Sequence, residues 1–296
     1  MFTGIVLLAF TFAVSATNIV LTNDDGWAVA LVRAQNDALN AAGYNVVLSC
    51  PAENESGTGS STETPKVLTS ACEFNTCPSG SPATGFNASN TRLNYVNAFP
   101  VKVRYPDALA SVFGGPPNFV VSGPNVGNNL GSTVLVSGTV GAATEAVLEG
   151  IPAAAFSAAT GSQSSFTTLT SSPTSTDTKA ALIYGALSVK LLNVLLASSA
   201  PILPAGILLN VNYPATTGSC TSTSAFKFVL TRINSNSSAV DVQTCGTTRL
   251  PTESSVVAMS GCFASVSVMN ASNKGDVNAT MQGVVLNKLE SILSCS

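Results

Sequence analysis

Residues 18–49 carry the pattern of a complete β-α-β unit. An apolar run at residues 18–21 ends in the polar turn Asn23-Asp24-Asp25-Gly26. A helical stripe of apolar residues follows and stops at Gly43, a residue type that commonly ends helices. A second apolar run spans residues 44–49. Because two strands joined in this way lie parallel with a right-handed crossover, we expect a parallel sheet.

The same alternation of strand and helix continues along the chain. Strands are predicted at residues 118–121, 152–157 and 207–211, and helices at residues 137–149 and 179–197. This order predicts an α/β fold with a Rossmann-like, doubly wound and mostly parallel sheet in a core at about residues 17–215. Further candidates predict a smaller β-rich extension at about residues 216–296, with strands at 226–233, 240–243 and 255–269 and a last helix at 277–293.

Two other segments have a less regular pattern. Residues 54–97 are rich in Ser, Thr and Gly, and they predict a long, partly ordered surface excursion with room for a hairpin. Residues 106–113 suit a short helix with a proline at its start. The apolar helix at residues 179–197 is short for a bilayer and is interrupted by Lys190 and Asn193, so we expect a core or dimer helix there.

The first sixteen residues have the features of a signal peptide. Residues 4–14 form an apolar run, and Val14-Ser15-Ala16 is a small-residue cleavage site. A buried first strand or a membrane anchor is the alternative interpretation of this run. We expect a secreted chain that begins near Thr17 and has no membrane span after cleavage. Five sequons then become candidate glycosylation sites, at Asn54, Asn87, Asn236, Asn270 and Asn278.

The chain has seven cysteines, which in an oxidising compartment predict three disulfides and one free thiol. Cys50 ends an apolar run and is the expected buried, free thiol. Cys72 and Cys77 are close enough in sequence to close one loop. Three pairings stay open for the remaining four cysteines, and we favour Cys220–Cys245 with Cys262–Cys295.

The composition excludes several classes of chemistry. The chain has no histidine, which excludes Ser-His-Asp hydrolases, histidine phosphatases and His-ligated zinc sites. The net charge of −3 and the small number of charged residues argue against a basic stripe that binds a nucleic-acid polymer. Any reaction must therefore use carboxylates, hydroxyls, amides, the backbone or a metal ion.

Asp24 and Asp25 stand at the end of the first predicted strand. A strand-to-helix turn there opens onto the crevice where open α/β sheets bind their ligands. Two neighbouring carboxylates repel unless a proton or a cation lies between them, and a divalent ion with oxygen ligands meets that need. The alternative is an ordinary helix N-cap beside a solvated carboxylate.

The loop after the strand at residues 118–121 opens onto the same crevice. There Asn125 can offer an amide oxygen to a metal, although an Asn-rich turn would also explain it. Ser137-Gly138-Thr139 places hydroxyls and free N–H groups at a helix start, which suits a phosphate group or simple N-capping. Ser56-Gly57, after the second strand, adds one more hydroxyl at this edge.

Taken together, these motifs resemble the SurE family of phosphatases and nucleotidases. The matching segments are Asn23-Asp24-Asp25-Gly26, Ser56-Gly57, residues 121–131, Ser137-Gly138-Thr139-Val140 and, more loosely, residues 209–214. The resemblance implies a three-layer α/β/α fold and a secreted, eukaryotic-type member that hydrolyses nucleoside 5′/3′-monophosphates or other small phosphomonoesters. It further implies Mg²⁺ or Mn²⁺ as cofactor and a possible homodimer.

The resemblance also assigns the site residues. The implied metal ligands are Asp24, Asp25, Ser56 and Asn125. The implied phosphate-binding residues are Asn129, Ser137, Gly138 and Thr139. By general chemistry, Asp24 or Asp25 would orient or deprotonate the attacking water, or attack directly.

Some positions depart from the family pattern around these residues. The segment Trp27-Ala28-Val29-Ala30 replaces an Ala-Pro-Gly stretch, Glu55 replaces a basic residue, and Ser132-Thr133 replaces an acidic pair. The Gly-Thr-Pro-x-Asp segment is reduced to residues 99–102. These changes spare the implied metal ligands and alter the rim. A secreted phosphate- or nucleotide-binding protein with little turnover is therefore the second hypothesis, and a cell-surface structural protein is a third.

Overall fold

The structure is a computed structural model that describes residues 16–102 and 112–296. The expected signal peptide, apart from Ala16, and most of the expected helix at 106–113 lie outside the described residues. The strands are β1 Asn18–Thr22, β2 Asn45–Pro51, β3 Thr84–Asn87, β4 Asn90–Val96, β5 Phe119–Val126, β6 Ala153–Ala158, β7 Ile207–Tyr213, β8 Lys227–Thr231, β9 Phe263–Asn270 and β10 Gly275–Asp276. The α-helices are α1 Ala30–Ala41, α3 Gly138–Leu148, α4 Thr168–Ser171, α5 Thr176–Ala197, α6 Glu253–Val257 and α7 Ala279–Leu289.

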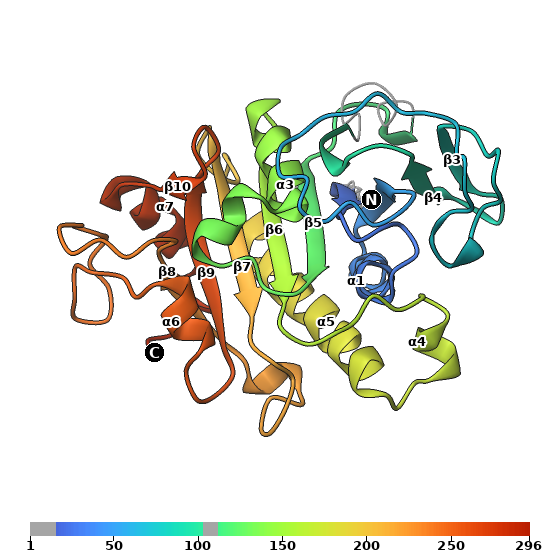
Figure 1. Ribbon diagram of the computed structural model, residues 1–296. Helices are drawn as coiled ribbons and strands as arrows, with labels where there is room; N and C mark the ends of the chain where they lie inside the picture. The colour runs from blue at the N-terminus through green and yellow to red at the C-terminus, as the bar shows by residue number, and fades with distance from the viewer. Residues whose placement is uncertain (1–15, 103–111) are drawn as a thin grey trace, which may run out of the picture.

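The strands form one sheet in the order β10-β9-β7-β6-β5-β1-β2-β4-β3, with β8 beside β9 (Figure 1). The six neighbouring strands from β4 to β7 all run parallel. Antiparallel pairing begins only near the two edges, where β3 meets β4 and β9 meets β7. The predicted doubly wound, mostly parallel α/β sheet is confirmed.

Helices cover both faces of this sheet, as the alternating side chains of β1 require. Ile19 and Leu21 point to the face that α1 and α5 cover, whereas Val20 packs against α3 residues on the opposite face. Figure 1 shows α1 and α5 on one side of the sheet and α3 on the other. The result is the three-layer arrangement implied by the family resemblance.

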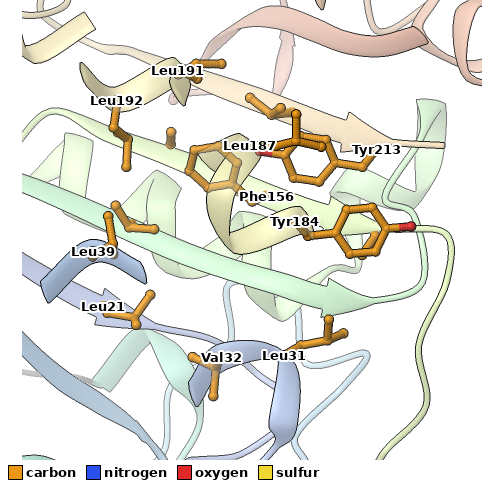
Figure 2. Close-up of a cluster of buried hydrophobic side chains, with 14 of the residues drawn as sticks. Leu21, Leu31, Val32, Leu39, Phe156, Tyr184, Leu187, Leu191, Leu192 and Tyr213 are labelled. Atoms are coloured by element: carbon orange, nitrogen blue, oxygen red, sulfur yellow. The ribbon is translucent and has the colours of Figure 1, made fainter. Parts of the chain in front are cut away.

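Helix α5 is a core helix. It is the only helix in the described ranges that is long and apolar enough to cross a membrane. Half of its most apolar 18-residue stretch is buried inside the fold. Tyr184 of α5 stacks on Tyr213 of β7, with ring centroids 5.3 Å apart, and its hydroxyl donates to the Pro214 carbonyl. Figure 2 shows Leu187 and Leu191 of the same helix in this apolar cluster. The burial matches the expected core helix.

The Ser/Thr/Gly-rich excursion contributes to the sheet. β3 and β4 form the expected hairpin, and β4 also pairs in parallel with β2. Leu93 and Tyr95 of β4 are buried, so this part of the segment belongs to the core.

Two strand predictions in the C-terminal part are wrong. Residues 240–243 form no strand, because their backbone hydrogen bonds go elsewhere: Asp241 N donates to the Thr248 carbonyl, and Val242 N donates to Gln282. The strand expected at 255–269 begins only at Phe263, because its first residues belong to α6. The Thr252 side chain caps that helix by accepting from Ser255 N.

The favoured pairing of the last four cysteines is also wrong. The disulfides are Cys220–Cys262 and Cys245–Cys295. Parallel pairing of β8 with β9 brings the starts of both strands together, and Cys220 and Cys262 precede those strands. The C-terminus returns to β8, where Leu293 bridges to Phe228, and this places Cys295 near Cys245. The Cys72–Cys77 disulfide and the buried free thiol of Cys50 are confirmed.

Candidate active site

The turn that carries Asp24 and Asp25 follows β1 at the carboxyl edge of the parallel strands. Asn23 closes the turn on itself: its Nδ2 donates to Gly26 O at 3.1 Å, and its Oδ1 accepts from Gly26 N at 3.2 Å. Gly26 has a φ of +116°, which L side chains rarely adopt. The turn keeps both aspartates buried, and each is only 2% exposed.

The Asp24 carboxylate meets side chains from β5 and α3. Thr139 Oγ1 is hydrogen-bonded to Asp24 Oδ1 and lies 3.1 Å from Asn125 Oδ1. The amide nitrogen of Asn125 donates to Gly127 O at 2.7 Å, so its oxygen faces the Thr139 hydroxyl. A hydroxyl has one hydrogen and cannot satisfy both oxygens at once. Three oxygen atoms therefore converge around Thr139 Oγ1 with one acceptor left without its hydrogen, an arrangement that suits a cation.

The Asp25 carboxylate reaches across to β5. Its Oδ2 accepts from Val126 N at 2.8 Å. Since Asn125 precedes this N–H group, β1 and β5 position the aspartates and the amide as one unit. The parallel pairing of the two strands thus brings the Asp25 side chain to a backbone N–H group 101 residues away in sequence.

The N-terminus of α3 points at the Asp24 carboxylate. Ser137 is the N-cap and accepts from Val140 N at 3.1 Å. A Cβ atom at Gly138 would lie 2.8 Å from Asp24 Cβ and 2.9 Å from its Oδ2, so only glycine lets the helix approach this closely. The positive end of the helix dipole therefore lies against the site, where it favours negative charge.

Burial dominates the ionisation of both aspartates. It raises the pKa of Asp24, although the Thr139 hydroxyl and the N–H groups of Thr139 and Gly138 act in the opposite direction. Burial, followed by the charge of Asp24, raises the pKa of Asp25 to about 8. Without a compensating cation, ionisation of both carboxyl groups is unfavourable near neutral pH.

The donor set suits a hard divalent cation. It offers carboxylate, amide and hydroxyl oxygens, which Mg²⁺ and Mn²⁺ prefer, and no sulfur or imidazole. Across residues 16–102 and 112–296, no three His, Cys, Asp or Glu side chains gather into a metal-binding group. A cation here would consequently depend on Asn125 and hydroxyl oxygens as well as on the aspartates.

Ser56 is near this cluster in the chain path but is not joined to it by a side-chain contact. Its loop is attached to the site through the backbone, because Glu55 N donates to Asp24 O at 2.7 Å. The Ser56 residue itself is exposed. Its assignment as a metal ligand stays a prediction.

Asn129 lies in the interior, on the β6 and β7 side of the site. Its Nδ2 donates to Ser157 Oγ at 2.9 Å, and its backbone N–H donates to Asn212 Oδ1 at 2.8 Å. These bonds fix the loop that follows β5. The second hydrogen of this amide could still bind phosphate, and a direct contact with phosphate stays a prediction for Asn129.

Sequence reasoning missed the residues that support this loop from the C-terminal extension. Glu253 is fully buried; its Oε1 accepts from Gly131 N at 2.7 Å, and its Oε2 accepts from Asn210 Nδ2 and Ser267 Oγ, both at 2.9 Å. Asn210 donates in turn to the Asn129 carbonyl. The alternation of apolar and Asn residues in β7 was a readable signal, whereas nothing near Glu253 marked it as buried.

Comparisons with known proteins agree with this architecture. The family model described as "Survival protein SurE" matches residues 19–240. An acid phosphatase of Yarrowia lipolytica is 33% identical over 293 residues, which cover 86% of this chain and 80% of that protein. A 5′-nucleotidase SurE of Thermosynechococcus vestitus is 35% identical over 211 residues, which cover 67% of this chain and 63% of that protein.

A solved structure shows the same fold. The crystal structure of the SurE protein from Aquifex aeolicus superposes with a TM-score of 0.59 at 21% identity, covering 91% of this chain and 98% of that one. The family match spans the Asp24 turn, the Asn125 strand and the start of α3. By the family match and the identity to the yeast phosphatase, the chain belongs to the SurE family.

Proposed function

We propose that this protein is a divalent-metal-dependent phosphomonoesterase that hydrolyses nucleoside 5′/3′-monophosphates or other small phosphomonoesters. The observation that carries the proposal is the convergence of Asp24, Asn125 and Thr139 oxygens directly in front of the N-terminus of α3. Such a place suits a cation and a phosphate group together. The names of the relatives, acid phosphatase and 5′-nucleotidase, support the same reaction class.

Each group in the site has a role in this reaction. Asp24, Asp25, Ser56 and Asn125 would hold Mg²⁺ or Mn²⁺. A bound divalent ion would neutralise phosphate charge and acidify a water molecule. The N–H groups of Gly138 and Thr139, with the Ser137 hydroxyl and Asn129, would bind phosphoryl oxygens.

The aspartates would also handle the proton. Asp25 is fixed through Oδ2 by Val126 N, which leaves Oδ1 free to accept a proton from an attacking water. The α3 N-terminus, including the Thr139 hydroxyl, holds the Asp24 carboxylate, and the Glu55 N–H group holds its backbone carbonyl, so Asp24 suits a positional role in charge stabilisation.

We further propose that the protein is secreted, since three disulfides fit an oxidising compartment. The substrate would be a small phosphomonoester, with no nucleic-acid polymer as partner and a homodimer as a possible assembly. A binding protein with little turnover is the second candidate. Asn54, a sequon on the loop beside Asp24, motivates it, because a glycan there would crowd the rim.

The test is turnover of p-nitrophenyl phosphate and of 5′- and 3′-AMP by purified protein. A chelator should abolish hydrolysis, and Mg²⁺ or Mn²⁺ should restore it. Asp24→Asn should lower kcat by about 100-fold or more, because it removes charge that holds the cation. Ser137→Ala should lower it less, because the helix N–H groups remain.

Asp37→Asn on the exposed side of α1 is the matched control and should leave kcat unchanged. A hydrolysis rate that is unchanged both by the chelator and by Asp24→Asn would refute the mechanism. Tight binding of AMP without turnover under every metal tried would favour the binding-protein alternative.

A further inference from the structure

The loop closed by the Cys72–Cys77 disulfide lies against the turn that carries Asp24 and Asp25. Glu73 N donates to Ala52 O at 3.2 Å, which attaches the loop to the chain just after β2. The Trp27 indole donates to Thr76 Oγ1 at 2.9 Å, which attaches it to the residue that follows the turn. The sequence suggests only a small disulfide-closed surface loop, but in the structure this loop packs against the Asp25-Gly26-Trp27 turn.

Glu73 is the residue of this loop that faces the turn. A Cβ atom at Gly26 would overlap Glu73 Oε2, so the glutamate carboxylate occupies the space that any other residue at position 26 would need. That Oε2 atom is buried and has no hydrogen-bond partner. The other oxygen, Oε1, accepts from Gln163 Nε2 at 2.7 Å.

Gln163 connects a third segment to the same turn. Its Nε2 donates both to Glu73 Oε1 and to the backbone carbonyl of Asp25. A primary amide nitrogen has two hydrogens, so one glutamine serves both acceptors at once. No glutamate or leucine at position 163 could make these two bonds.

The loop that carries Gln163 is itself fixed to the start of α1. Ala30 N donates to Ser164 O at 2.8 Å, and Phe166 N donates to Ala28 O at 2.8 Å. The glutamine is thus presented from a rigid support, with its amide plane set by Glu73 on one side and by Asp25 on the other.

We propose that Gln163 and Glu73 form a clamp that positions Asp25, with both acting as positioning residues for the proposed phosphomonoesterase. Asp25 is then held at two points: Gln163 binds its backbone carbonyl, and Val126 N binds its carboxylate. Because one anchor binds the backbone and the other binds the side chain, together they fix the direction in which the free Oδ1 atom points. Glu73 keeps the Gln163 amide turned so that nitrogen, and not oxygen, faces Asp25.

The clamp predicts an effect on metal binding and turnover that exceeds its effect on stability. Partners of a ligating side chain commonly change metal affinity or activity by about 10- to 100-fold when they are removed. Gln163→Leu keeps the approximate volume and removes both bonds. We expect its Mn²⁺ affinity, measured by calorimetry, to weaken about tenfold or more and kcat to fall similarly, with KM within about twofold of the wild type.

Two further variants separate positioning from folding. Glu73→Gln retains an oxygen that can accept from Gln163 and should keep Mn²⁺ affinity and kcat within about threefold of the wild type, whereas Glu73→Ala should match Gln163→Leu. The double variant Glu73→Ala with Gln163→Leu should lose no more than either single one, because both remove the same clamp. Ser165→Ala, on the same loop, is the control, because the Ser165 hydroxyl accepts hydrogen bonds from Thr167 and makes none to Asp25 or Glu73.

The outcomes are distinct from those of the proposed function. Calorimetry of Mn²⁺ with the intact chain tests the clamp even if no substrate is turned over. An active wild type with unchanged Mn²⁺ affinity and kcat in Gln163→Leu would overturn the clamp and leave the phosphomonoesterase proposal standing. Losses that are additive in the double variant, or equal in Ser165→Ala, would also overturn it, since they would report general loosening of the loops.

Discussion

Gly138→Ala is the sharpest test of how closely α3 must approach Asp24. The new Cβ atom would lie 2.8 Å from Asp24 Cβ, 2.9 Å from Asp24 Oδ2 and 3.1 Å from Pro100 Cγ. Carbon atoms in ordinary contact are about 3.5 Å apart, so the helix and the aspartate must separate by roughly 0.7 Å. The aspartate cannot simply turn away, because Glu55 N and the Thr139 hydroxyl hold it.

Two opposing effects decide the outcome for stability. Alanine is favoured over glycine by about 1 kcal/mol in a helix interior, which is an upper limit for Gly138 because it is the first residue of α3, whereas overpacking of a filled site costs about 1–3 kcal/mol. We expect a net loss of free energy of unfolding, of about 1 kcal/mol. For activity only the displacement counts: a shift of about 1 Å can cost about 100-fold, so kcat should fall between about 10- and 100-fold.

The assay is hydrolysis of p-nitrophenyl phosphate at saturating Mn²⁺, with urea unfolding in parallel. Gly283→Ala in α7 is the matched control, because its Cβ would meet Val242 at an ordinary 3.5 Å. That variant should gain up to about 1 kcal/mol and keep full activity. A Gly138→Ala protein that is stabilised and turns over at the wild-type rate would refute the close approach of α3 to Asp24.

Three further predictions concern charge, disulfides and processing. Burial raises the pKa of Glu253 to about 7. Between about pH 4.5 and pH 7 the Glu253 side chain keeps its proton in the folded state but has lost it in the unfolded state. The contribution of Glu253 to the free energy of unfolding is therefore present at low pH and is lost as the pH rises through 7. In urea unfolding, the wild type should lose about 2–3 kcal/mol more than Glu253→Gln between pH 5 and pH 8. Equal slopes would refute it. Cys245→Ser with Cys295→Ser opens a loop with a sequence separation of 50 and should cost about 2–4 kcal/mol in the same assay, so an unchanged midpoint would contradict the pairing. Amino-terminal sequencing of protein from a secreting host should begin near Thr17, and recovery of Met1 with seven free thiols would contradict secretion.

The parallel half of the fold was predictable because each strand and helix there carries its own local signal. The run at residues 18–21 is apolar and short, Gly43 ends α1, and the same features recur to residue 213. The motif residues Asp24, Asn125 and Thr139 were also found, since Asp24 follows β1 and Thr139 lies in the first turn of α3. Asn125 was expected in a loop after residues 118–121 but lies inside β5, near the carboxyl end of that strand, because the strand continues to Val126. Parallel pairing then does the rest, because it brings equivalent strand ends together.

The rest depended on long-range contacts that leave no local trace. The Val-Val pair at residues 256–257 favours a strand by propensity, yet the cap from Thr252 and the burial of Val256 make it helical. The disulfide pairing follows from the order of the strands in the sheet, and the spacing of cysteines along the chain does not predict that order. Gln163 and Glu73 were missed for a related reason: a glutamine in a loop and a glutamate beside a cysteine look like solvated residues until both are found on Asp25 and Gly26.

The bond from Gly131 N to Glu253 has a consequence for the order in which the protein is made. Every residue assigned to the metal or the phosphate lies between Asp24 and Thr139, so all of them leave the ribosome early. The carboxylate that holds Gly131 is synthesised more than a hundred residues later, on a helix flanked by the Cys220–Cys262 and Cys245–Cys295 bridges. A nascent chain can thus contain the complete set of site residues while its phosphate-side loop still lacks a partner, and competence would come only when the last quarter of the polypeptide has folded onto the sheet.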